Sequence, residues 1–492
     1  MGGVGDWSPA GSYAADMTGR SVHPPSSGPA ASGQVLRFGT DGVRARAGSV
    51  LDEPAVRALG RAAAAHLGAD CVVIGRDTRE SGPALALALA EGLVDGGLDV
   101  TSLGVVPTPA VAHECQIDGV AGAVVSASHN PWFDNGIKLF AAGGRKLDDR
   151  VQSAIQEAWD ACPRLDGPRV APDWDDPSEE TAAGRRWVEA LIRWAIYEGS
   201  LDGREVARQQ VDERPLAGRS LVVDCANGAT SAFAADILRR LGAEVGVIHA
   251  SPDGRNINEG CGSTHPDDLR AAVLQTGADA GLAFDGDGDR VIAVSDDGTL
   301  LDGDDLLAVC GIDLHDRGLL TGDTMAVTVM ANLGLRRALA DHGIAVHETA
   351  VGDRYVLEAL EANGWVLGGE QSGHVIFRSM ATTGDGLLTG IQALVAAGRA
   401  GRTLGGRVAD LMVRAPQVLH AVPVSADGVT VVASMADEVT EAAAQLGSAG
   451  RVLVRPSGTE PVVRVMVEAF DAAEAAAVAD RLVESVRRAD RY

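Results

Sequence analysis

Aromatic side chains and long apolar runs are both scarce in this 492-residue sequence. Phe, Trp and Tyr make up 4% of the chain, while hydrophobic residues as a group make up 46%. The core is therefore expected to consist mainly of Val, Leu, Ile and Ala. A bilayer-spanning helix needs about 20 consecutive apolar residues, and no stretch of the sequence meets that need. We therefore expect no membrane partner and a cytoplasmic location.

Positive charge is also in short supply. The 42 Lys and Arg residues against 68 Asp and Glu residues give a formal net charge of −26. A field of that sign repels nucleic acid and anionic membranes, so neither is expected as a partner. It would repel a sugar phosphate as well. An anionic substrate would thus require local Arg, Lys and backbone N–H groups that reverse the field at its site.

The six cysteines show no CxxC spacing, and several lie within apolar runs. Zinc sites show closely spaced cysteine pairs, and six scattered cysteines in a chain of this length do not indicate a disulfide framework. We therefore expect buried, reduced thiols, as is typical of a cytosolic protein. The cysteines are Cys71, Cys115, Cys162, Cys225, Cys261 and Cys310.

The length of the chain predicts three or four domains. Residues 1–33 are rich in Gly, Ser, Ala and Pro without apolar periodicity, which predicts a disordered tail. After the tail, short apolar runs alternate with Ala- and Leu-rich helical segments, a pattern typical of α/β proteins. Three such runs resemble one another, and each precedes a helix-like segment. They are Cys71–Asp77, Leu221–Gly228 and Met325–Asn332.

The expected fold class is therefore α/β, with three tandem related α/β domains and a smaller C-terminal α+β domain. The predicted boundaries give domains at 34–180, 181–297, 298–413 and 414–492. Segment 196–215 is polar and irregular and is left unassigned. In the last domain we expect strands near 429–432, 451–455 and 462–468.

The run Asp285-Gly286-Asp287-Gly288-Asp289-Arg290, the triple-Asp loop, follows an apolar segment. Alternating glycines allow a tight turn in which three carboxylates converge. Three oxygen ligands leave room for a phosphate oxygen on a divalent cation, which suits Mg²⁺. A solvated, inert turn and a calcium loop are the alternatives. An EF-hand loop would need Gly at its sixth position and Glu at its twelfth, which are Arg290 and Asp296 here.

The run Ser126–Pro131, the Ser128 loop, follows the apolar strand-like segment Val120–Val125. Ligands of α/β proteins lie at the carboxyl ends of strands, so Ser128 is placed to carry a phosphoryl group. Phosphoryl transfer depends more on positioning and charge neutralisation than on activation of the serine. The alternative is that Ser128 and Asn130 only cap a turn.

Two further loops are rich in polar side chains between glycines. In Gly368–His374, the Glu370 loop, Glu370 and Ser372 could bind vicinal sugar hydroxyls. In Arg455–Pro461, the Arg455 loop, guanidinium, hydroxyls and backbone N–H groups resemble a phosphate cradle. Each loop has a plain reading as a hairpin or turn. Further cations near the predicted loops are Arg76, Arg79 and Arg354.

Four loops of this kind, in this order, resemble the α-D-phosphohexomutase family. The resemblance extends over roughly residues 36–475. Two of its motifs, Asn256–His265 and Glu370–His374, resemble the branch that acts on glucosamine phosphates more than those that act on mannose or glucose phosphates. Its other motifs are Phe38–Arg44, Ser126–Lys138 and Val454–Pro461.

The resemblance implies four domains around a central cleft and a role for each motif. Ser128 would carry the transferable phosphate and, with Asp285, Asp287 and Asp289, hold one Mg²⁺. Arg44, His129 and Lys138 would surround the phosphoserine as catalytic residues. The substrate-binding set would be Arg290, Glu370, Ser372 and His374 around the sugar, with Arg455, Ser457, Gly458, Thr459 and Arg464 around its other phosphate.

The reaction so implied converts glucosamine 6-phosphate to glucosamine 1-phosphate. Phosphorylated Ser128 would give a glucosamine 1,6-bisphosphate intermediate, and the product would supply UDP-N-acetylglucosamine for cell-wall synthesis. The alternatives are a phosphomannomutase or phosphoglucomutase and, in another class, a non-catalytic sugar-phosphate sensor. One position departs from the family pattern, because Ala45 follows Arg44 where Gly is usual. The sequence leaves a homodimer open.

Overall fold

The computed structural model describes residues 36–39, 41–167, 174, 182–196, 214–457 and 461–490. The tail expected at 1–33 and most of segment 196–215 lie outside these residues. The described chain forms two compact units. The larger unit holds residues 36–331 and 339–411, and the smaller unit holds residues 332–338 and the chain from 412 onward.

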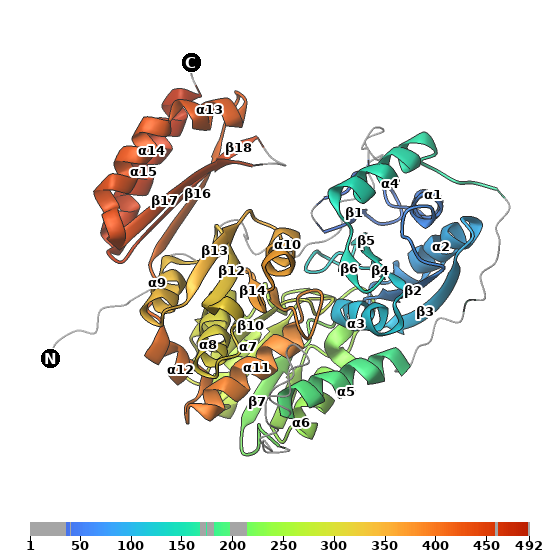
Figure 1. Ribbon diagram of the computed structural model, residues 1–492, viewed down its shortest axis with the longest axis horizontal. Coiled ribbons are helices and arrows are strands. Elements are labelled where there is room, and N and C mark those ends of the chain that lie inside the picture. The colour runs from blue at the N-terminus through green and yellow to red at the C-terminus, as the bar shows by residue number, and fades with distance from the viewer. Residues whose placement is uncertain are drawn as a thin grey trace. The chain divides into compact units, whose positions relative to one another are not determined.

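The first sheet of the larger unit has the strand order β1-β5-β4-β2-β3, with β6 beside β5. Helices α1, α2 and α4 pack on one face, and α3 with α5 on the other (Figure 1). The strands are β1 (Val43–Arg46), β2 (Cys71–Arg76), β3 (Asp99–Val105), β4 (Ala121–Val125), β5 (Asp134–Ala141) and β6 (Arg145–Lys146). The helices are α1 (Glu53–Ala64), α2 (Gly82–Asp95), α3 (Thr108–Asp118), α4 (Asp149–Ala161) and α5 (Ala182–Ile196).

The second sheet has the order β11-β10-β9-β7-β8, and the third has the order β15-β14-β12-β13. The strands of the second sheet are β7 (Ser220–Asp224), β8 (Glu244–Ile248), β9 (Ala280–Phe284), β10 (Val291–Ser295) and β11 (Leu300–Leu301). Helices α6 (Ala234–Arg240) and α7 (Asp267–Thr276) accompany it. The third contains β12 (Thr324–Thr328), β13 (Ala345–Thr349), β14 (Leu367–Gly369) and β15 (Val375–Phe377). Helices α8 (Gly303–Asp316), α10 (Asp353–Asn363), α11 (Gly386–Arg399) and α12 (Leu404–Leu411) accompany it. Helix α9 (Leu333–Asp341) begins in the smaller unit.

The three sheets repeat one arrangement. In each, one inner strand (β2, β7 or β12) pairs in parallel with a neighbour on either side. One of those neighbours then pairs antiparallel with the next strand. The three strand–turn–helix openings expected from the sequence begin with this inner strand in each sheet. The prediction of three related α/β domains is therefore confirmed by the topology.

The predicted functional loops occupy equivalent places in the fold. The Ser128 loop joins β4 to β5, the triple-Asp loop joins β9 to β10, and the Glu370 loop joins β14 to β15. Each therefore lies at the turn between two adjacent antiparallel strands. The carboxyl end of a buried strand thus presents each polar loop.

The smaller unit contains a three-stranded antiparallel sheet with the order β16-β18-β17. Its core lies between one face of the sheet and its helices (Figure 1). The elements are β16 (Gln417–Pro423), β17 (Gly450–Pro456), β18 (Val462–Ala469), α13 (Gly428–Ser434), α14 (Ala436–Leu446) and α15 (Ala472–Ala489). The Arg455 loop joins β17 to β18.

The prediction of a strand near 429–432 is wrong, because these residues form α13. Asp427 caps this helix, its side chain accepting a hydrogen bond from the Thr430 N–H at 3.1 Å. The strand β16, which the sequence did not predict, takes the place beside β18. The β-branched run 429–432 favours a strand by propensity alone, but the cap and the burial of Val431 favour a helix.

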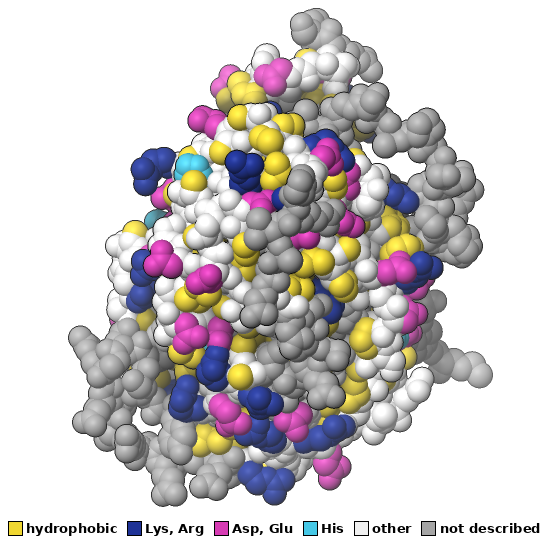
Figure 2. All heavy atoms as spheres, turned by 90° about the vertical axis from the view of Figure 1, so that its right-hand side faces the viewer, with side chains coloured by type: hydrophobic (Ala, Val, Ile, Leu, Met, Phe, Trp, Pro, Cys, Tyr) yellow, Lys and Arg dark blue, Asp and Glu magenta, His cyan; other side chains and the backbone are white. Residues whose placement is uncertain are grey.

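The core is aliphatic, as the composition predicts. Four cysteines are buried, Cys71 is half-buried and Cys162 is exposed. Basic and acidic side chains lie interspersed on the face in Figure 2. Among the described residues, no helix combines the length and the apolarity that crossing a membrane requires.

Candidate functional site

Ser128 lies in a buried turn with its hydroxyl aimed at the triple-Asp loop. Its Oγ donates a hydrogen bond to Asp285 Oδ2 at 2.5 Å and lies 3.4 Å from His129 Nδ1. Its backbone is in the left-handed region, with φ 54°. The N–H of Ser128 donates to Ser126 Oγ at 2.9 Å. The fold thus joins the predicted serine to the first of the predicted aspartates, 157 positions away.

The three aspartates of the triple-Asp loop converge as predicted. Asp285, Asp287 and Asp289 are buried, and one oxygen of each lies within 4.8 Å of the others. Burial, together with the carboxylates of Asp289 and Asp287, raises the pKa of Asp285 well above its ordinary value. A cluster of this kind is costly without a counter-ion, because like charges are held close in a low dielectric.

Two oxygens of this cluster test its fit to a metal ion. Asp287 Oδ1 and Asp289 Oδ1 are buried and accept no hydrogen bond from the described residues. Buried polar atoms are rarely left without a partner. Unpaired carboxylate oxygens at one point are the ligands that Mg²⁺ prefers. The triad therefore fits a magnesium ion.

Lys138, on β5, connects the triple-Asp loop to the first sheet. Its Nζ lies 2.9 Å from one oxygen each of Asp41, Asp287 and Asp289. Burial alone would lower the pKa of this amine, but the carboxylates of Asp287, Asp289 and Asp41 hold it well above its ordinary value. Lys138 is therefore a permanent cation. It is placed to neutralise charge near Ser128.

A cavity of about 340 Å³ beside this cluster is rich in arginine. Arg44 lines it, and its Nη1 donates to the Ala127 carbonyl at 3.3 Å, so the cavity wall is joined to the Ser128 loop. Guanidinium groups recognise phosphate oxygens. The lining thus supplies the local positive charge that the acidic chain needs for an anionic substrate. The lining residues are Arg37, Gly39, Asp41, Gly42, Arg44 and Arg290.

His129 is held in its neutral form. Burial, together with the cations Arg290 and Arg44, lowers the pKa of this imidazole to about 4. At neutral pH the ring beside Ser128 Oγ is therefore uncharged. His129 thus contacts Ser128, Arg44 contacts the Ser128 loop at Ala127, and Lys138 contacts the triple-Asp loop. Their catalytic roles remain predictions.

The Glu370 loop lies next to the triple-Asp loop along the backbone of β10. The Val291 N–H donates to the Gly373 carbonyl at 3.2 Å. Glu370 and Ser372 are partly exposed, and Ser372 Oγ donates to Glu370 Oε2 at 3.4 Å. His374 is buried instead, with Nε2 accepting the Gly384 N–H at 3.0 Å and Nδ1 3.7 Å from Asp289.

The Arg455 loop belongs to the smaller unit. Arg455 and Arg464 lie directly opposite each other on β17 and β18. Burial and the charge of Arg464 lower the pKa of Arg455. Like charges placed opposite each other destabilise a sheet unless an anion lies near them. Ser457 lies at the start of the turn, while Gly458 and Thr459 lie outside the described residues.

The sequence did not single out several side chains at this site. Asp41 accepts from Lys146 Nζ at 2.8 Å, and Lys146 also pairs with Asp353 of α10. Thr108 donates to Asp287 at 2.6 Å. Asp41 lies inside a motif noted for its likeness to the family, which was the only signal.

Two of the predicted local cations have structural roles instead. Arg79 is buried, and all its described partners are the Asp77 carboxylate and backbone carbonyls. Arg354 pairs with Asp149 at 2.5 Å and with Glu358 at 3.4 Å. The positive charge at the site therefore comes from other residues.

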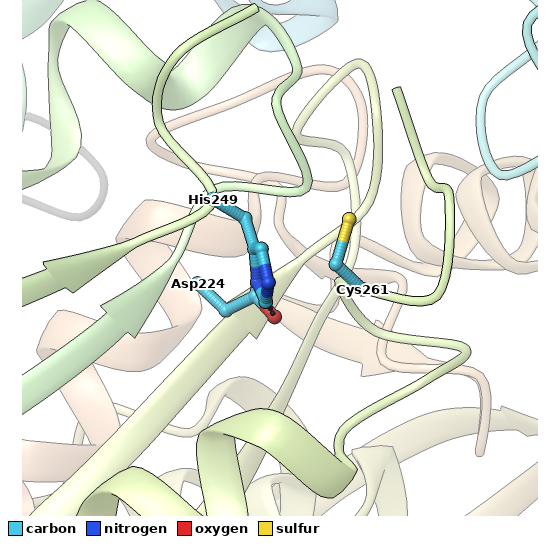
Figure 3. A group of neighbouring side chains, drawn as sticks. All are labelled: Asp224, His249 and Cys261. Carbon is cyan, nitrogen blue, oxygen red and sulfur yellow. Dashed lines mark ion pairs between the residues drawn. The ribbon is translucent and has the colours of Figure 1, made fainter. Parts of the chain in front are cut away.

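A second group of side chains with metal-ligand chemistry lies in the second sheet (Figure 3). His249 Nδ1 lies 3.1 Å from Asp224 Oδ2, and Cys261 lies beside them. Both Asp224 oxygens already accept backbone N–H groups, from Ala226 and Gly262, each at 2.9 Å. These hydrogen bonds give the cluster a role in ordering its loops.

Comparison with protein families gives four matches along the chain. Three are to the phosphoglucomutase/phosphomannomutase alpha/beta/alpha domains I, II and III, at residues 35–162, 204–298 and 302–415. The fourth is to the phosphoglucomutase/phosphomannomutase C-terminal domain, at residues 413–485. These matches confirm the expected fold class.

Individual relatives agree. The phosphoglucosamine mutase of Thermobifida fusca is 48% identical over 461 residues, covering 92% of this chain and 98% of the relative. The structure of a phosphoglucomutase/phosphomannomutase family protein from Burkholderia thailandensis superposes with TM-score 0.76 at 26% identity, covering 92% of this chain and 97% of that one.

An Aspergillus fumigatus N-acetylphosphoglucosamine mutase, solved with GlcNAc-6P and magnesium, shares the fold. Its TM-score is 0.62 at 18% identity, covering 93% of this chain and 97% of that one. The serine, the aspartates and the arginine-lined cavity lie in one unit. The loops and the relatives therefore indicate the same family. The chain belongs to the phosphoglucomutase/phosphomannomutase family, the α-D-phosphohexomutases, and is an intramolecular phosphotransferase of the isomerase class.

Proposed function

We propose that this phosphohexomutase interconverts glucosamine 6-phosphate and glucosamine 1-phosphate through a phosphorylated Ser128. The substrate assignment is supported by the phosphoglucosamine mutases that are 46–48% identical over nearly the whole chain. The mechanism is supported above all by one observation. The buried Ser128 hydroxyl lies 2.5 Å from a carboxylate of the triple-Asp loop.

The reaction takes place in two transfers of one kind. The P–Oγ bond of phosphorylated Ser128 breaks while a new P–O bond forms to a free hydroxyl of the sugar phosphate, which gives glucosamine 1,6-bisphosphate. The bisphosphate turns, and its other phosphate returns to Ser128. Because both ends carry phosphate, either end can face the serine. The product is then a precursor for UDP-N-acetylglucosamine and the cell wall.

Each side chain around Ser128 has a different role in the transfer. Lys138 and Arg44 are placed to neutralise charge on the transferring group, and the neighbouring carboxylates keep the pKa of the Lys138 amine well above its ordinary value. His129, whose Nδ1 lies 3.4 Å from Ser128 Oγ, returns a proton to Oγ when the serine is the leaving group and takes it up again when the serine hydroxyl attacks the bisphosphate. A Mg²⁺ ion held by Asp285, Asp287, Asp289 and the serine's phosphate would add electrostatic stabilisation.

The substrate is bound at the remaining predicted positions. Arg290, Glu370, Ser372 and His374 would define the sugar end, with Glu370 and Ser372 on the accessible side of their loop. Arg455 and Arg464 would bind the other phosphate, since an anion relieves their mutual repulsion. Ser457, Gly458 and Thr459 would complete that cradle. The domain boundaries expected from the sequence, and a homodimer, remain predictions.

Ser128→Ala tests the mechanism. We expect no phosphate on the variant by intact-mass analysis and a loss of turnover of at least about a thousandfold, because the chemistry lacks its carrier. Wild-type protein should carry one phosphate on Ser128. A fully active Ser128→Ala enzyme would refute the phosphoenzyme mechanism.

The sugar is tested separately. Steady-state rates on the 6-phosphates of glucosamine, glucose and mannose should be highest for glucosamine. Equal or faster turnover of mannose 6-phosphate would replace the substrate proposal by the phosphomannomutase alternative and leave the phosphoserine mechanism standing.

A further inference from the structure

Left-handed backbone is concentrated around the Ser128 loop. Six non-glycine residues have positive φ in the described part of the chain, and five of them are linked by hydrogen bonds at one junction between the first and second sheets. Such a conformation is strained in residues other than Gly and persists only where the surroundings hold it. The five are Ser128 (54°), Ala226 (54°), Asn227 (48°), His249 (48°) and Asn258 (58°).

Two side chains from different domains hold the Ser128 carbonyl. Arg79 Nη2 donates to it at 2.9 Å, and Asn258 Nδ2 donates to it at 2.8 Å. The same two groups donate to the Asn130 carbonyl, at 2.8 Å and 3.1 Å. Both carbonyls of the turn are therefore fixed from two sides. The serine hydroxyl remains directed at Asp285.

Arg79 is fully committed to this turn. Its Nε pairs with Asp77 at 2.8 Å, and its other nitrogens donate to the carbonyls of Ser128, Asn130, Pro131 and Asp134. Arg79 is 1% exposed, so it is out of a substrate's reach. A planar, multidentate cation in this place fixes the path of the backbone rather than binding a ligand.

Asn258 is itself held by the second sheet. Its N–H donates to the Ala226 carbonyl at 2.9 Å. Further along the same loop, Gly262 N–H donates to Asp224 Oδ2 at 2.9 Å. Asp224 belongs to the cluster with His249 and Cys261 in Figure 3. That cluster therefore anchors the loop that presents Asn258.

The triple-Asp loop passes directly against this contact. A Cβ added at Gly286 would lie 2.7 Å from the Ser128 carbonyl oxygen and 2.8 Å from Asn258 Nδ2. Glycine between two of the aspartates is thus required for the approach of the two loops. The Ser128 loop, the Asn258 loop and the triple-Asp loop meet at a single carbonyl oxygen.

We propose that Asn258 and Arg79 are positioning residues that hold Ser128 in its left-handed conformation for phosphoryl transfer. Within the motif Asn256–His265, Asn258 is then the residue that acts on the Ser128 loop. The proposal rests on the proposed role of Ser128. It assigns to Asn258 a function in the transfer step and none in substrate binding.

Asn258→Ala and Asn258→Asp test this assignment in the full-length enzyme loaded with Mg²⁺. We expect kcat to fall about 10–100-fold while KM changes by less than about twofold, because misplacement of the reacting group affects only the transfer step. Asn258→Asp should lose more than Asn258→Ala, since it sets a carboxylate against two carbonyl oxygens. Single-turnover transfer of phosphate from glucose 1,6-bisphosphate to Ser128 should slow by the same factor as kcat.

Two matched controls separate positioning from loss of structure. Asn256→Ala changes the same residue type in the same loop, but the Asn256 side chain bonds only exposed backbone of its own loop. Arg255→Ala removes the exposed ion pair with Glu80 and the cation–π contact with Trp132, both of which also join the two sheets' domains. Both should keep wild-type kcat. Thermal unfolding of every variant should be followed in parallel.

Arg79→Lys is a second test, because lysine keeps the positive charge but lacks the planar guanidinium that donates to several carbonyls. We expect a folded enzyme with lowered kcat and unchanged KM. Asn258 variants with wild-type kcat, or with a raised KM alone, would overturn the proposal. If instead Ser128→Ala were active, the proposed function would fail first, so the two failures are distinguishable.

Discussion

The three aspartates of the triple-Asp loop differ in their surroundings, although they are two residues apart. Asp285 accepts the serine hydroxyl, Asp287 accepts Thr108 and Lys138, and Asp289 pairs with Lys138. Burial would raise the pKa of Asp289, but Lys138 and the neighbouring His374 hold it well below its ordinary value. The pKa values of two carboxyls of the cluster are thus shifted in opposite directions. A divalent cation would favour the ionised form of all three.

Magnesium should therefore stabilise the folded chain. At about a hundredfold excess over its dissociation constant, a ligand specific to the folded state adds about 2.7 kcal/mol to the free energy of unfolding. Asp287→Asn should remove most of this gain, because it removes a charged ligand. Urea unfolding in MgCl₂ and in NaCl of equal ionic strength provides the measurement. An equal gain from NaCl would show that only the net charge of −26 is being screened.

Asp385 gives a pH dependence of its own. Burial raises the pKa of this carboxyl to about 6, despite hydrogen bonds from Leu388 N–H and Trp187 Nε1 at 2.9 Å each. Between about pH 4 and pH 6 the folded state keeps a proton that the unfolded state has released. Stability from this group is therefore present at low pH and is lost as pH rises through that range.

The expected size is about 2–3 kcal/mol for a shift of about two pKa units. Asp385→Asn does not titrate, so the difference in unfolding free energy between wild type and variant should change by this amount across the range. Urea unfolding at pH 4 and pH 7 tests it. A constant difference between the two proteins would contradict the prediction.

Among single residues, the sequence predicts those whose close spacing forms a recognisable motif. The alternation of Asp and Gly from Asp285 to Asp289 predicted that the three carboxylates converge, because local backbone geometry alone brings them together. Asp41 could not be found in this way. Its partners Lys138 and Lys146 lie about a hundred positions further along the chain and meet it only through β5 and β6.

Among the elements, helices α1 and α2 make an unusually close contact. A Cβ at Gly60 would lie 2.5 Å from the Leu89 carbonyl oxygen, and a Cβ at Gly92 would overlap the Arg57 carbonyl oxygen. Two glycines thus allow the helix backbones to touch. The contact supports the core beneath the first sheet.

Gly92→Ala should therefore destabilise the larger unit by about 1–3 kcal/mol, because the helices must separate. Gly398→Ala is the matched control in α11, where no described atom lies within 4 Å of an added Cβ. It should stabilise by about 0.5–1 kcal/mol through helix propensity. Thermal unfolding of both variants decides. Similar effects of the same sign would rule out close packing as the cause.

The elements that sequence reasoning placed well are the buried strands. Cys71–Arg76, Ser220–Asp224 and Thr324–Thr328 are continuous apolar runs with polar loops after them. The run at 429–432 shows the limit. Its β-branched residues favour a strand, yet one capping aspartate and the packing of a single valine made it a helix.

On the scale of the whole molecule, Glu468 holds the smaller unit together. This buried carboxylate accepts hydrogen bonds from Asn332 Nδ2, Leu333 N–H, Gln417 Nε2 and Arg451 Nε, at 2.6–3.1 Å. It thereby fastens the sheet β16-β18-β17 to the beginning of α9. The unit has a hydrophobic core of its own.

Glu468→Gln should therefore lower the stability of the smaller unit by about 3–5 kcal/mol, because a buried ion pair loses one partner. Glu484→Gln, which breaks the exposed pair with Arg487, should change it by less than about 1 kcal/mol. Calorimetry should show the loss in the smaller unit's transition alone. A uniform shift of all transitions would mean that the two units unfold together.

The four-domain plan was predictable from the repeated openings and the order of the loops. The contacts that hold each unit together could not be predicted from the sequence. They include the contact of Asn332 with Glu468, 136 positions apart, whose partners carry no motif. Long-range pairing of this kind is set by the packed fold.

The distribution of the cysteines has a practical consequence. Burial raises the pKa of the Cys115, Cys225 and Cys261 thiols to about 12, and Cys310 is buried as well. Cys162 is exposed at the end of α4. Maleimide reagents need an accessible thiol. The native chain thus offers the exposed Cys162 as an attachment point for a fluorophore without any engineered substitution.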